Sequence, residues 1–307
     1  MEQKLKMKFK AHQTFAFRKG WLGKGLRALT KDPSILMPSN SKTAMDELGL
    51  GANQVVSMRY WLEAAGLIRK RSKDHVIERL GQLILERDPY IEEIGTLWAI
   101  HCNIASARLI ASAWYFFFNE FNVVGAFDKD AFTHALEHYI FLHNDKPKVA
   151  LTSLESDFSC IVNTYVPRER TSNKRHSPES VIDCPLSELG LIDVENRAAK
   201  TYRKKPASLG MLPSLLVLYP TCQTENQLKK AGSDPASEIK LETLLNGACG
   251  PGRIYNLDSV ALLTKLYELE SDEKLRINRT AGLDVVRLAN PRMTKEDCLR
   301  EYYDWIG

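Results

Sequence analysis

Four polar side chains are of the types that chemistry on a phosphodiester requires. His12 lies a few residues before Arg18 and Lys24, and an imidazole beside two cations suits a general base flanked by groups that stabilise negative charge. Asp157 lies in a largely apolar segment, where a carboxylate is a catalytic candidate, a helix cap or one half of a buried pair. These four residues are our first candidates for an active site.

A second cluster has the spacing of a zinc site. His134, Glu137 and His138 form an H-x-x-E-H string, in which both histidines fall on one face of a helix and the glutamate can act as a base. A third possible ligand, His143, follows, but the sequence identifies no ligand on a neighbouring helix. Solvated or core histidines are therefore the alternative to a zinc hydrolase.

Signatures of nucleases and nucleotide-binding enzymes are incomplete. Glu238-Ile239-Lys240 matches one half of a restriction-type nuclease core, but Asp234 is too close to supply the other half, and the surroundings predict a helix. The sequence contains neither G-x-x-x-x-G-K-[ST] nor G-x-G-x-x-G, so we expect no nucleotide cofactor.

The stretch 42–77 predicts a winged helix-turn-helix that would position DNA. A helix over 42–48, a glycine turn at 49–51 and a helix over 54–65 capped by Ala52 or Asn53 are followed by a β-hairpin over 67–77. Val55, Met58, Leu62 and Ala65 predict its buried stripe. The residues expected to reach DNA lie on the opposite face and on the hairpin: Asn53, Gln54, Ser57, Arg59, Tyr60, Arg69, Lys70, Arg71 and Lys73. A winged helix that serves only packing or protein contacts is the alternative.

The N-terminus is strongly basic and rich in aromatic rings. Residues 1–31 contain nine Lys or Arg and a single acid, Glu2, which suits a polyanion. Phe9, Phe15, Phe17 and Trp21 alternate with polar groups, and we expect these rings both to stack on bases and to pack as a strap on the winged helix.

Composition points to a reduced, cytoplasmic protein. Six cysteines lie far apart without a C-x-x-C pair, which argues against a zinc ribbon or a disulfide framework. No apolar segment follows the basic N-terminus, and the run 109–118 is too short to span a bilayer. We therefore expect no membrane contact.

The fold class predicted from these patterns is mainly α with small β-hairpins. We divide the chain into a basic arm plus winged helix (1–87), a helical domain (88–166) and a mostly helical C-terminal domain (167–307) that contains a second, degenerate winged helix. Asp88-Pro89 predicts the start of a helical segment that continues through 91–100. Further helices are predicted over 104–118, 131–143, 149–166, 209–219, 238–245, 256–269 and 294–305, and 167–178 predicts an exposed loop. If 193–202 is also helical, Arg197, Lys200 and Lys204 share a face.

Several strings together resemble a bacterial family catalogued only as a domain of unknown function. They include His12-Gln13-Thr14-Phe15, Arg18-Lys19-Gly20-Trp21-Leu22, the run 48–55, Arg59-Tyr60-Trp61-Leu62, Asp88-Pro89-Tyr90, the run 96–101, Asp157 with Tyr165, and the run 185–192. The chain departs from the family pattern in having Gln13 in place of Glu and Gln54 in place of Met. A carboxylate lost at position 13 puts a metal-dependent role of that motif in doubt.

The resemblance implies a function in DNA phosphorothioation and phage defence. Members lie beside phosphorothioation genes, which implies double-stranded DNA, an ATPase and sulfur-transfer proteins as partners, and a nick in one strand that lets sulfur enter the backbone. For a metal-dependent nicking endonuclease using Mg²⁺ or Mn²⁺, we assign His12 as base, Arg18 and Lys24 as charge stabilisers, and Asp157 or Asp88 as metal ligand. The alternative is a non-enzymatic DNA reader or transcriptional regulator, and we allow for a homodimer in either case.

Overall fold

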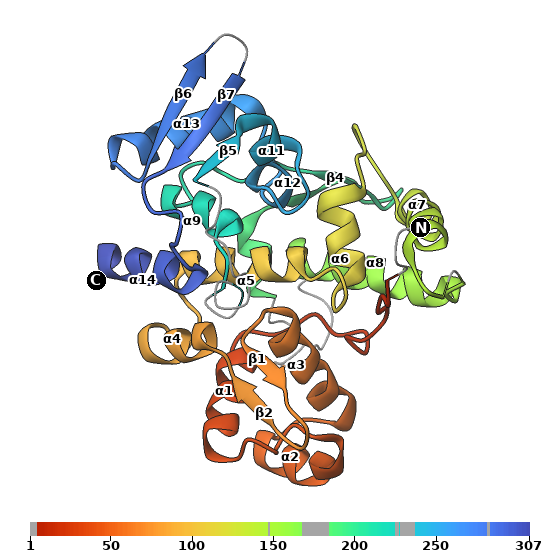
Figure 1. Cartoon of the computed structure of the whole chain (residues 1–307). Coiled ribbons are helices and arrows are strands. Elements are labelled where there is room, and N and C mark those ends of the chain that lie inside the picture. Colours follow the sequence, from red (N-terminus) through yellow and green to blue (C-terminus); the bar gives the residue numbers. More distant parts are fainter. Residues whose placement is uncertain (1–4, 147, 168–183, 225–226, 228–236, 281–282) are drawn as a thin grey trace.

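The computed structural model describes residues 5–146, 148–167, 184–224, 227, 237–280 and 283–307 (Figure 1). Most of the exposed loop predicted over 167–178 lies outside these residues, as does Asp234. The fold is mainly helical with small antiparallel sheets, as predicted. The longer helices are α1 (Trp21–Lys31), α2 (Ser41–Leu48), α3 (Ala52–Ala64), α4 (Arg79–Arg87), α5 (Ile94–Ser106), α7 (Lys129–His143), α8 (Leu151–Tyr165), α13 (Ser259–Ser271) and α14 (Lys295–Ile306).

Short helices and strands complete the chain. The short helices are α6 (Ser112–Tyr115), α9 (Ser214–Leu218), α11 (Leu241–Asn246) and α12 (Pro251–Ile254). The strands are β1 (Ile68–Lys70), β2 (His75–Ile77), β3 (Ile192–Asn196), β4 (Thr201–Lys204), β5 (Glu238–Lys240), β6 (Leu275–Thr280) and β7 (Leu283–Leu288).

A helix, a turn, a helix and a hairpin follow one another between α2 and β2. Gly49 ends α2 at φ 58°, a left-handed conformation that glycine adopts without a steric penalty. Helix α3 begins earlier than predicted, and its cap is Gly51, not Ala52 or Asn53, because the Gln54 side chain accepts a hydrogen bond from the Gly51 amide at 3.0 Å. The predicted stripe of α3 is buried, and it packs this unit against α1 and α2.

Strands β1 and β2 pair antiparallel with Arg69 opposite Val76. Ile68 and His75 point inward and are buried, whereas the tip is exposed. The amide of His75 donates to the carbonyl of Pro33 at 2.8 Å, which fixes the hairpin to the loop after α1.

Helix α5 is the centre of the molecule (Figure 1). It is buried on nearly every side, and α6, α9, α12 and α14 lie around it. Its buried His101 receives a hydrogen bond from the Tyr165 hydroxyl at 2.8 Å and donates one to the Ile254 carbonyl at 2.8 Å. The neutral imidazole of His101 thus connects α5 to both α8 and α12.

The expected helix start at Asp88-Pro89 is wrong. Asp88 ends α4, and its carboxylate accepts the amides of Glu92 at 2.9 Å and Glu93 at 3.1 Å. Ile91, which lies between Asp88 and these two glutamates, has φ 57°, so the chain turns before α5 begins at Ile94. The single helix expected over 104–118 is also interrupted, because α5 ends at Ser106 and a five-residue π-helix follows α6.

Two further segments expected to be helical are strands. The stretch 193–202 lies in the β3–β4 hairpin, with Val194 opposite Tyr202, so Arg197, Lys200 and Lys204 do not share a helical face. Residues Glu238–Lys240 form β5, which pairs with β7 in a sheet of order β5-β7-β6, before α11 begins. The helix expected over 209–219 is limited to α9, which follows Pro213.

Buried apolar residues form one connected core that runs from Met7 to Tyr303. Among the helices that the structure describes, none combines the length and the apolar character that crossing a bilayer requires.

Candidate functional site

The β1–β2 hairpin presents a group of exposed cations. Arg69, Lys70, Arg71 and Lys73 are all exposed. The Arg69 guanidinium is paired with the Glu78 carboxylate, with Nε 2.7 Å from Oε1. The tip therefore contributes Lys70, Arg71 and Lys73 as cations that solvent or a bound phosphate can reach.

Two of the residues expected to face DNA are inside the protein. The Ser57 side chain has no exposed surface and donates a hydrogen bond to the Phe15 carbonyl at 3.3 Å. Tyr60 is buried beside Trp61, with ring centroids 4.9 Å apart. The expectation for these two residues is wrong because the N-terminal segment covers that face of α3.

The remaining three candidate residues of α3 differ in whether their side chains are free to contact a ligand. Asn53 is exposed in the first turn of the helix. Gln54 is occupied by its cap at Gly51, and the Arg59 guanidinium donates to the Leu36 carbonyl at 2.9 Å. The N-terminal turn of α3 is therefore the part of this helix that can approach a base edge.

The N-terminal segment, residues 5–17, lies across the molecule as a strap. Its Phe15 carbonyl accepts the indole N–H of Trp61 at 2.8 Å, and Phe17 is buried in the core. Phe9 and Phe15 are partly buried against that core, and Trp21 is 6% exposed. The packing role expected of these rings is present, but they are not free to stack on bases.

His12 and Asp157 meet inside the protein, joining the strap to α8. His12 Nε2 lies 2.7 Å from Asp157 Oδ1, with side-chain exposures of 0% and 2%. The Thr14 amide donates to His12 Nδ1 at 3.0 Å, so Nδ1 is an acceptor and Nε2 carries the proton. The Lys10 amide donates to both carboxylate oxygens of Asp157, at 2.9 and 3.2 Å.

This arrangement occupies both nitrogens of the imidazole. Burial raises the pKa of Asp157, while the hydrogen bonds from His12 and the Lys10 amide act in the opposite direction. A base must reach the proton that it removes, and neither nitrogen of His12 faces solvent in this geometry. The pair fits a structural link, and sequence reasoning found its members without predicting that they bond to each other.

The other candidate catalytic residues are engaged separately. The Lys24 ammonium is bonded to the Leu48 carbonyl, and the Arg18 guanidinium lies over the Trp21 ring at 5.5 Å. Asp88 is buried and holds two backbone amides. The five residues are therefore not gathered around one exposed point.

The candidate metal ligands do not form a metal site. Within the described ranges, no three His, Cys, Asp or Glu side chains are grouped closely enough to hold an ion. His134 and His138 of the H-x-x-E-H string are exposed on α7. The Glu238 carboxylate is paired with Arg287, with 2.6 Å between oxygen and nitrogen. We therefore derive no catalytic step through a metal.

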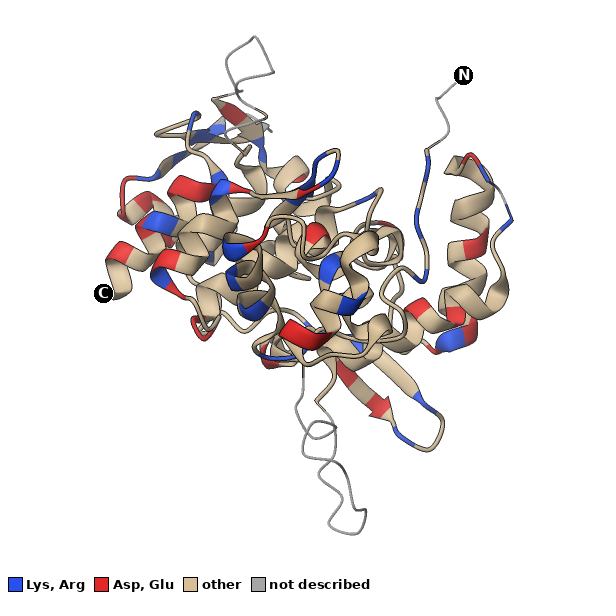
Figure 2. Cartoon of the chain, turned by 90° about the horizontal axis from the view of Figure 1, so that it is seen from below, with Lys and Arg blue, Asp and Glu red and all other residues tan. Residues whose placement is uncertain are grey.

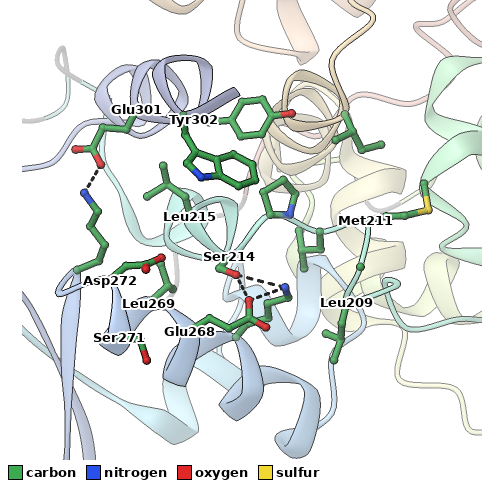
Figure 3. Close-up of a pocket in the computed structure, with 17 residues that line it drawn as sticks. Leu209, Met211, Ser214, Leu215, Glu268, Leu269, Ser271, Asp272, Glu301 and Tyr302 are labelled. Carbon is green, nitrogen blue, oxygen red and sulfur yellow. Dashed lines mark hydrogen bonds and ion pairs between the residues drawn. The ribbon is translucent and has the colours of Figure 1, made fainter. Parts of the chain in front are cut away.

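A cavity of about 1140 Å³ lies in the C-terminal half, between α9, α13 and α14 (Figure 3). Its walls are largely apolar and include Leu209, Met211 and Leu215. At one end the buried Lys265 ammonium lies 2.8 Å from Glu268 Oε2 and 3.3 Å from Ser214 Oγ. Sequence reasoning missed this cavity, because its lining comes from segments far apart in the chain.

Comparison with known proteins gives one family and two solved structures. The family described as "Protein of unknown function (DUF4007)" matches residues 9–303. A magnesium ion-bound SspB crystal structure is 26% identical with a TM-score of 0.82, and covers 98% of this chain and 89% of its own. A second SspB crystal structure is 24% identical with a TM-score of 0.81 and the same coverage. No curated protein matches the chain.

Proposed function

The chain belongs to the DUF4007 family, and from that premise we propose that it binds double-stranded DNA as a component of a phosphorothioate DNA-modification and phage-defence system. One observation carries the proposal. Helices α2 and α3 are followed directly by a hairpin whose tip exposes Lys70, Arg71 and Lys73, which is the order of elements expected of the proposed winged helix-turn-helix. The likeness to SspB structures over 98% of the chain supports the placement in such a system.

In the proposed complex, the cations of the hairpin tip contact phosphates while the first turn of α3 approaches the major groove. Phosphate contacts set affinity and orientation, and they make binding dependent on salt. Asn53 is the exposed side chain of α3 with both a donor and an acceptor, which suits adenine. The second helix–hairpin order, α13 with β6 and β7, is proposed as a degenerate copy of the same unit.

The finer part of the proposal is that the protein nicks one DNA strand. Its support is the family resemblance and the SspB neighbour that is described as magnesium-bound. Mg²⁺ is usually held by one or two carboxylates together with water and phosphate oxygens, so bound DNA would complete such a site. The residues that cut are not assigned, because the burial of His12 and Asp157 removes the first candidates.

The same burial favours a second candidate function, a DNA reader without strand cleavage. An assay of plasmid relaxation with Mg²⁺, Mn²⁺ or chelator separates the two functions. Open circles that require metal support the nickase, whereas retention of duplex without open circles, also after partner proteins are added, supports the reader.

DNA binding itself is tested by fluorescence anisotropy with a duplex oligonucleotide. We expect the variant Lys70→Gln, Arg71→Gln, Lys73→Gln to weaken binding and to lower the slope of log K against log salt by about 2 to 3. The matched control is Lys200→Gln with Arg203→Gln and Lys205→Gln, which removes three exposed charges at the β3–β4 hairpin. Unchanged binding by the hairpin variant would contradict the proposal.

A further inference from the structure

Three lysines point outward from the strap at every second residue. Lys6, Lys8 and Lys10 are exposed, whereas the alternate residues Leu5, Met7 and Phe9 pack toward the core. Alternation of this kind is the property of an extended chain, in which residues two apart are separated by about 6.6 Å. Figure 2 shows Lys and Arg recurring along the extended segment that leads from the N-terminus. We call Lys6, Lys8 and Lys10 the lysine row.

Four backbone amides along the lysine row donate hydrogen bonds to other elements. The Leu5 amide donates to the His143 carbonyl at 2.8 Å, and the Met7 amide donates to Asn144 Oδ1 at 3.1 Å. The Lys8 amide donates to Ser112 Oγ at 3.0 Å. The amide of Lys10 is held by Asp157, as described above. The row is therefore held extended up to Phe9 by these amide contacts and by the packing of the alternate side chains, and the chain turns at Lys10, where φ is 54°. The ammonium groups take no part in these contacts.

The charges of the row are available to a ligand. In the part of the chain that the structure describes, no carboxylate forms an ion pair with the Lys6, Lys8 or Lys10 ammonium. The exposed Lys146 adds a fourth cation near Leu5, because the neighbouring Asp145 amide donates to the Leu5 carbonyl at 2.7 Å. Like charges held along one line repel each other, so the arrangement favours a ligand with regularly repeated negative charge.

We propose that the lysine row is a second phosphate-binding track, on which a nucleic-acid strand lies extended along the strap. The inference rests on the proposed function and adds to it a contact surface beyond the hairpin tip. The strap ends on α3, where the Phe15 carbonyl is bound by Trp61 and Ser57. The track therefore leads from α3 toward α7 and lengthens the segment of DNA that the protein holds. Regular ammonium groups without nearby aromatic rings free to stack select the phosphodiester backbone, not the base sequence.

The test measures binding of the full chain to a duplex and to a single strand of equal length over a series of salt concentrations. We expect Lys6→Gln, Lys8→Gln, Lys10→Gln to lower the magnitude of the salt slope by about 2 to 3 on the ligand that uses the track. At 0.15 M salt this corresponds to a loss of roughly fortyfold to three-hundredfold in affinity, with 1 M salt as the reference. Loss on the duplex alone assigns the track to double-stranded DNA, and loss on the single strand alone assigns it to a displaced or nicked strand.

A control variant separates a track from a general effect of charge. Lys200→Gln, Arg203→Gln, Lys205→Gln removes three exposed cations at the β3–β4 hairpin, which lies outside both proposed DNA-binding units. Equal losses in both variants, or an unchanged slope in the strap variant, would overturn the inference. Because the backbone amides hold the strap, the strap variant should unfold at the same urea concentration as the wild type. Failure of the wild type itself to bind DNA would instead contradict the proposed function.

Discussion

The imidazole of His12 and the carboxylate of Asp157 are 2.7 Å apart in the interior, although 145 residues separate them in the sequence. Their bond, together with the amide of Lys10, holds the strap on α8. The strap in turn covers the face of α3 that contains Ser57. A pair that has the residue types of a catalytic dyad therefore positions the proposed DNA-binding unit relative to the helical core.

Replacing the carboxylate of this pair should destabilise the fold. Asp157→Asn removes the charge that pairs with His12 and replaces one of the two acceptor oxygens by an NH2 group, which cannot accept a hydrogen bond from the donors around it, so we expect a loss of about 3 kcal/mol in the free energy of unfolding. Urea denaturation measures it. Glu155→Gln, on the same helix, removes only the partly exposed pair with Lys129 and should cost less than about 1 kcal/mol. Equal effects of the two substitutions would contradict a special role for Asp157.

Two polar residues of α3 should separate binding from stability. Asn53→Ala removes an exposed side chain and should weaken specific DNA binding by about tenfold, with little change in unfolding. Ser57→Ala removes a buried bond to the Phe15 carbonyl and should lower stability by about 1 kcal/mol, with DNA affinity kept. Anisotropy titrations and urea unfolding of both variants check this, and the reverse assignment would show that the wrong face of α3 was chosen.

The buried imidazole of His101 should make stability depend on pH in the acidic range. Burial lowers its pKa from 6.5 to about 4, so between these values the unfolded chain binds a proton that the folded chain does not. This contribution to stability is complete above pH 6.5 and is lost as the pH falls toward 4. We expect His101→Gln to be less stable at pH 7 but to show a smaller decrease in stability from pH 6.5 to 4.5. Parallel curves for variant and wild type would refute the assignment.

Lys204 should make the stability of the fold rise with pH in the alkaline range, as His101 does in the acidic range. Burial lowers the pKa of its ammonium to about 7, and the Arg253 charge adds to this effect. Between pH 7 and 10.5 the unfolded chain holds a proton that the folded chain has released, so stability should rise with pH across this interval. Lys204→Met, with a side chain of similar length, should flatten that rise. Urea midpoints from pH 7 to 9.5 measure it, with the exposed Lys200→Met as control.

Local pattern predicted α2, α3 and the β1–β2 hairpin, because helical periodicity, glycine turns and a basic tip all lie within 36 neighbouring residues. The burial of Ser57 and Tyr60 is not a local property, since the strap that covers them is held by a helix more than ninety residues later. Strand β5 was missed for a similar reason. Its partner β7 follows about 45 residues downstream, and a three-residue strand has no periodicity of its own.

The candidate site was likewise predictable only where it depends on local sequence. Exposed cations on a hairpin follow from residue type, but the partners that occupy Gln54, Arg59 and Asp88 are backbone groups, which a sequence does not place. The family resemblance was confirmed by a match over residues 9–303. The residues alone predicted DNA binding, whereas the resemblance also implied a role in DNA phosphorothioation.

The long separation between the strap and α8 has a consequence for synthesis on the ribosome. At 5 to 20 residues per second, roughly 7 to 30 s pass between the emergence of His12 and that of Asp157, the 145 residues between them being translated in that time. During this interval α1 to α3 and their hairpin can form from local contacts, while residues 5–12 of the strap lack the later partners that hold them, among them Ser112, Asn144 and Asp157. The newly made N-terminal unit therefore emerges with its strap bound at Phe15 but free over residues 5–12, and the order of translation makes docking of these residues a late step of folding.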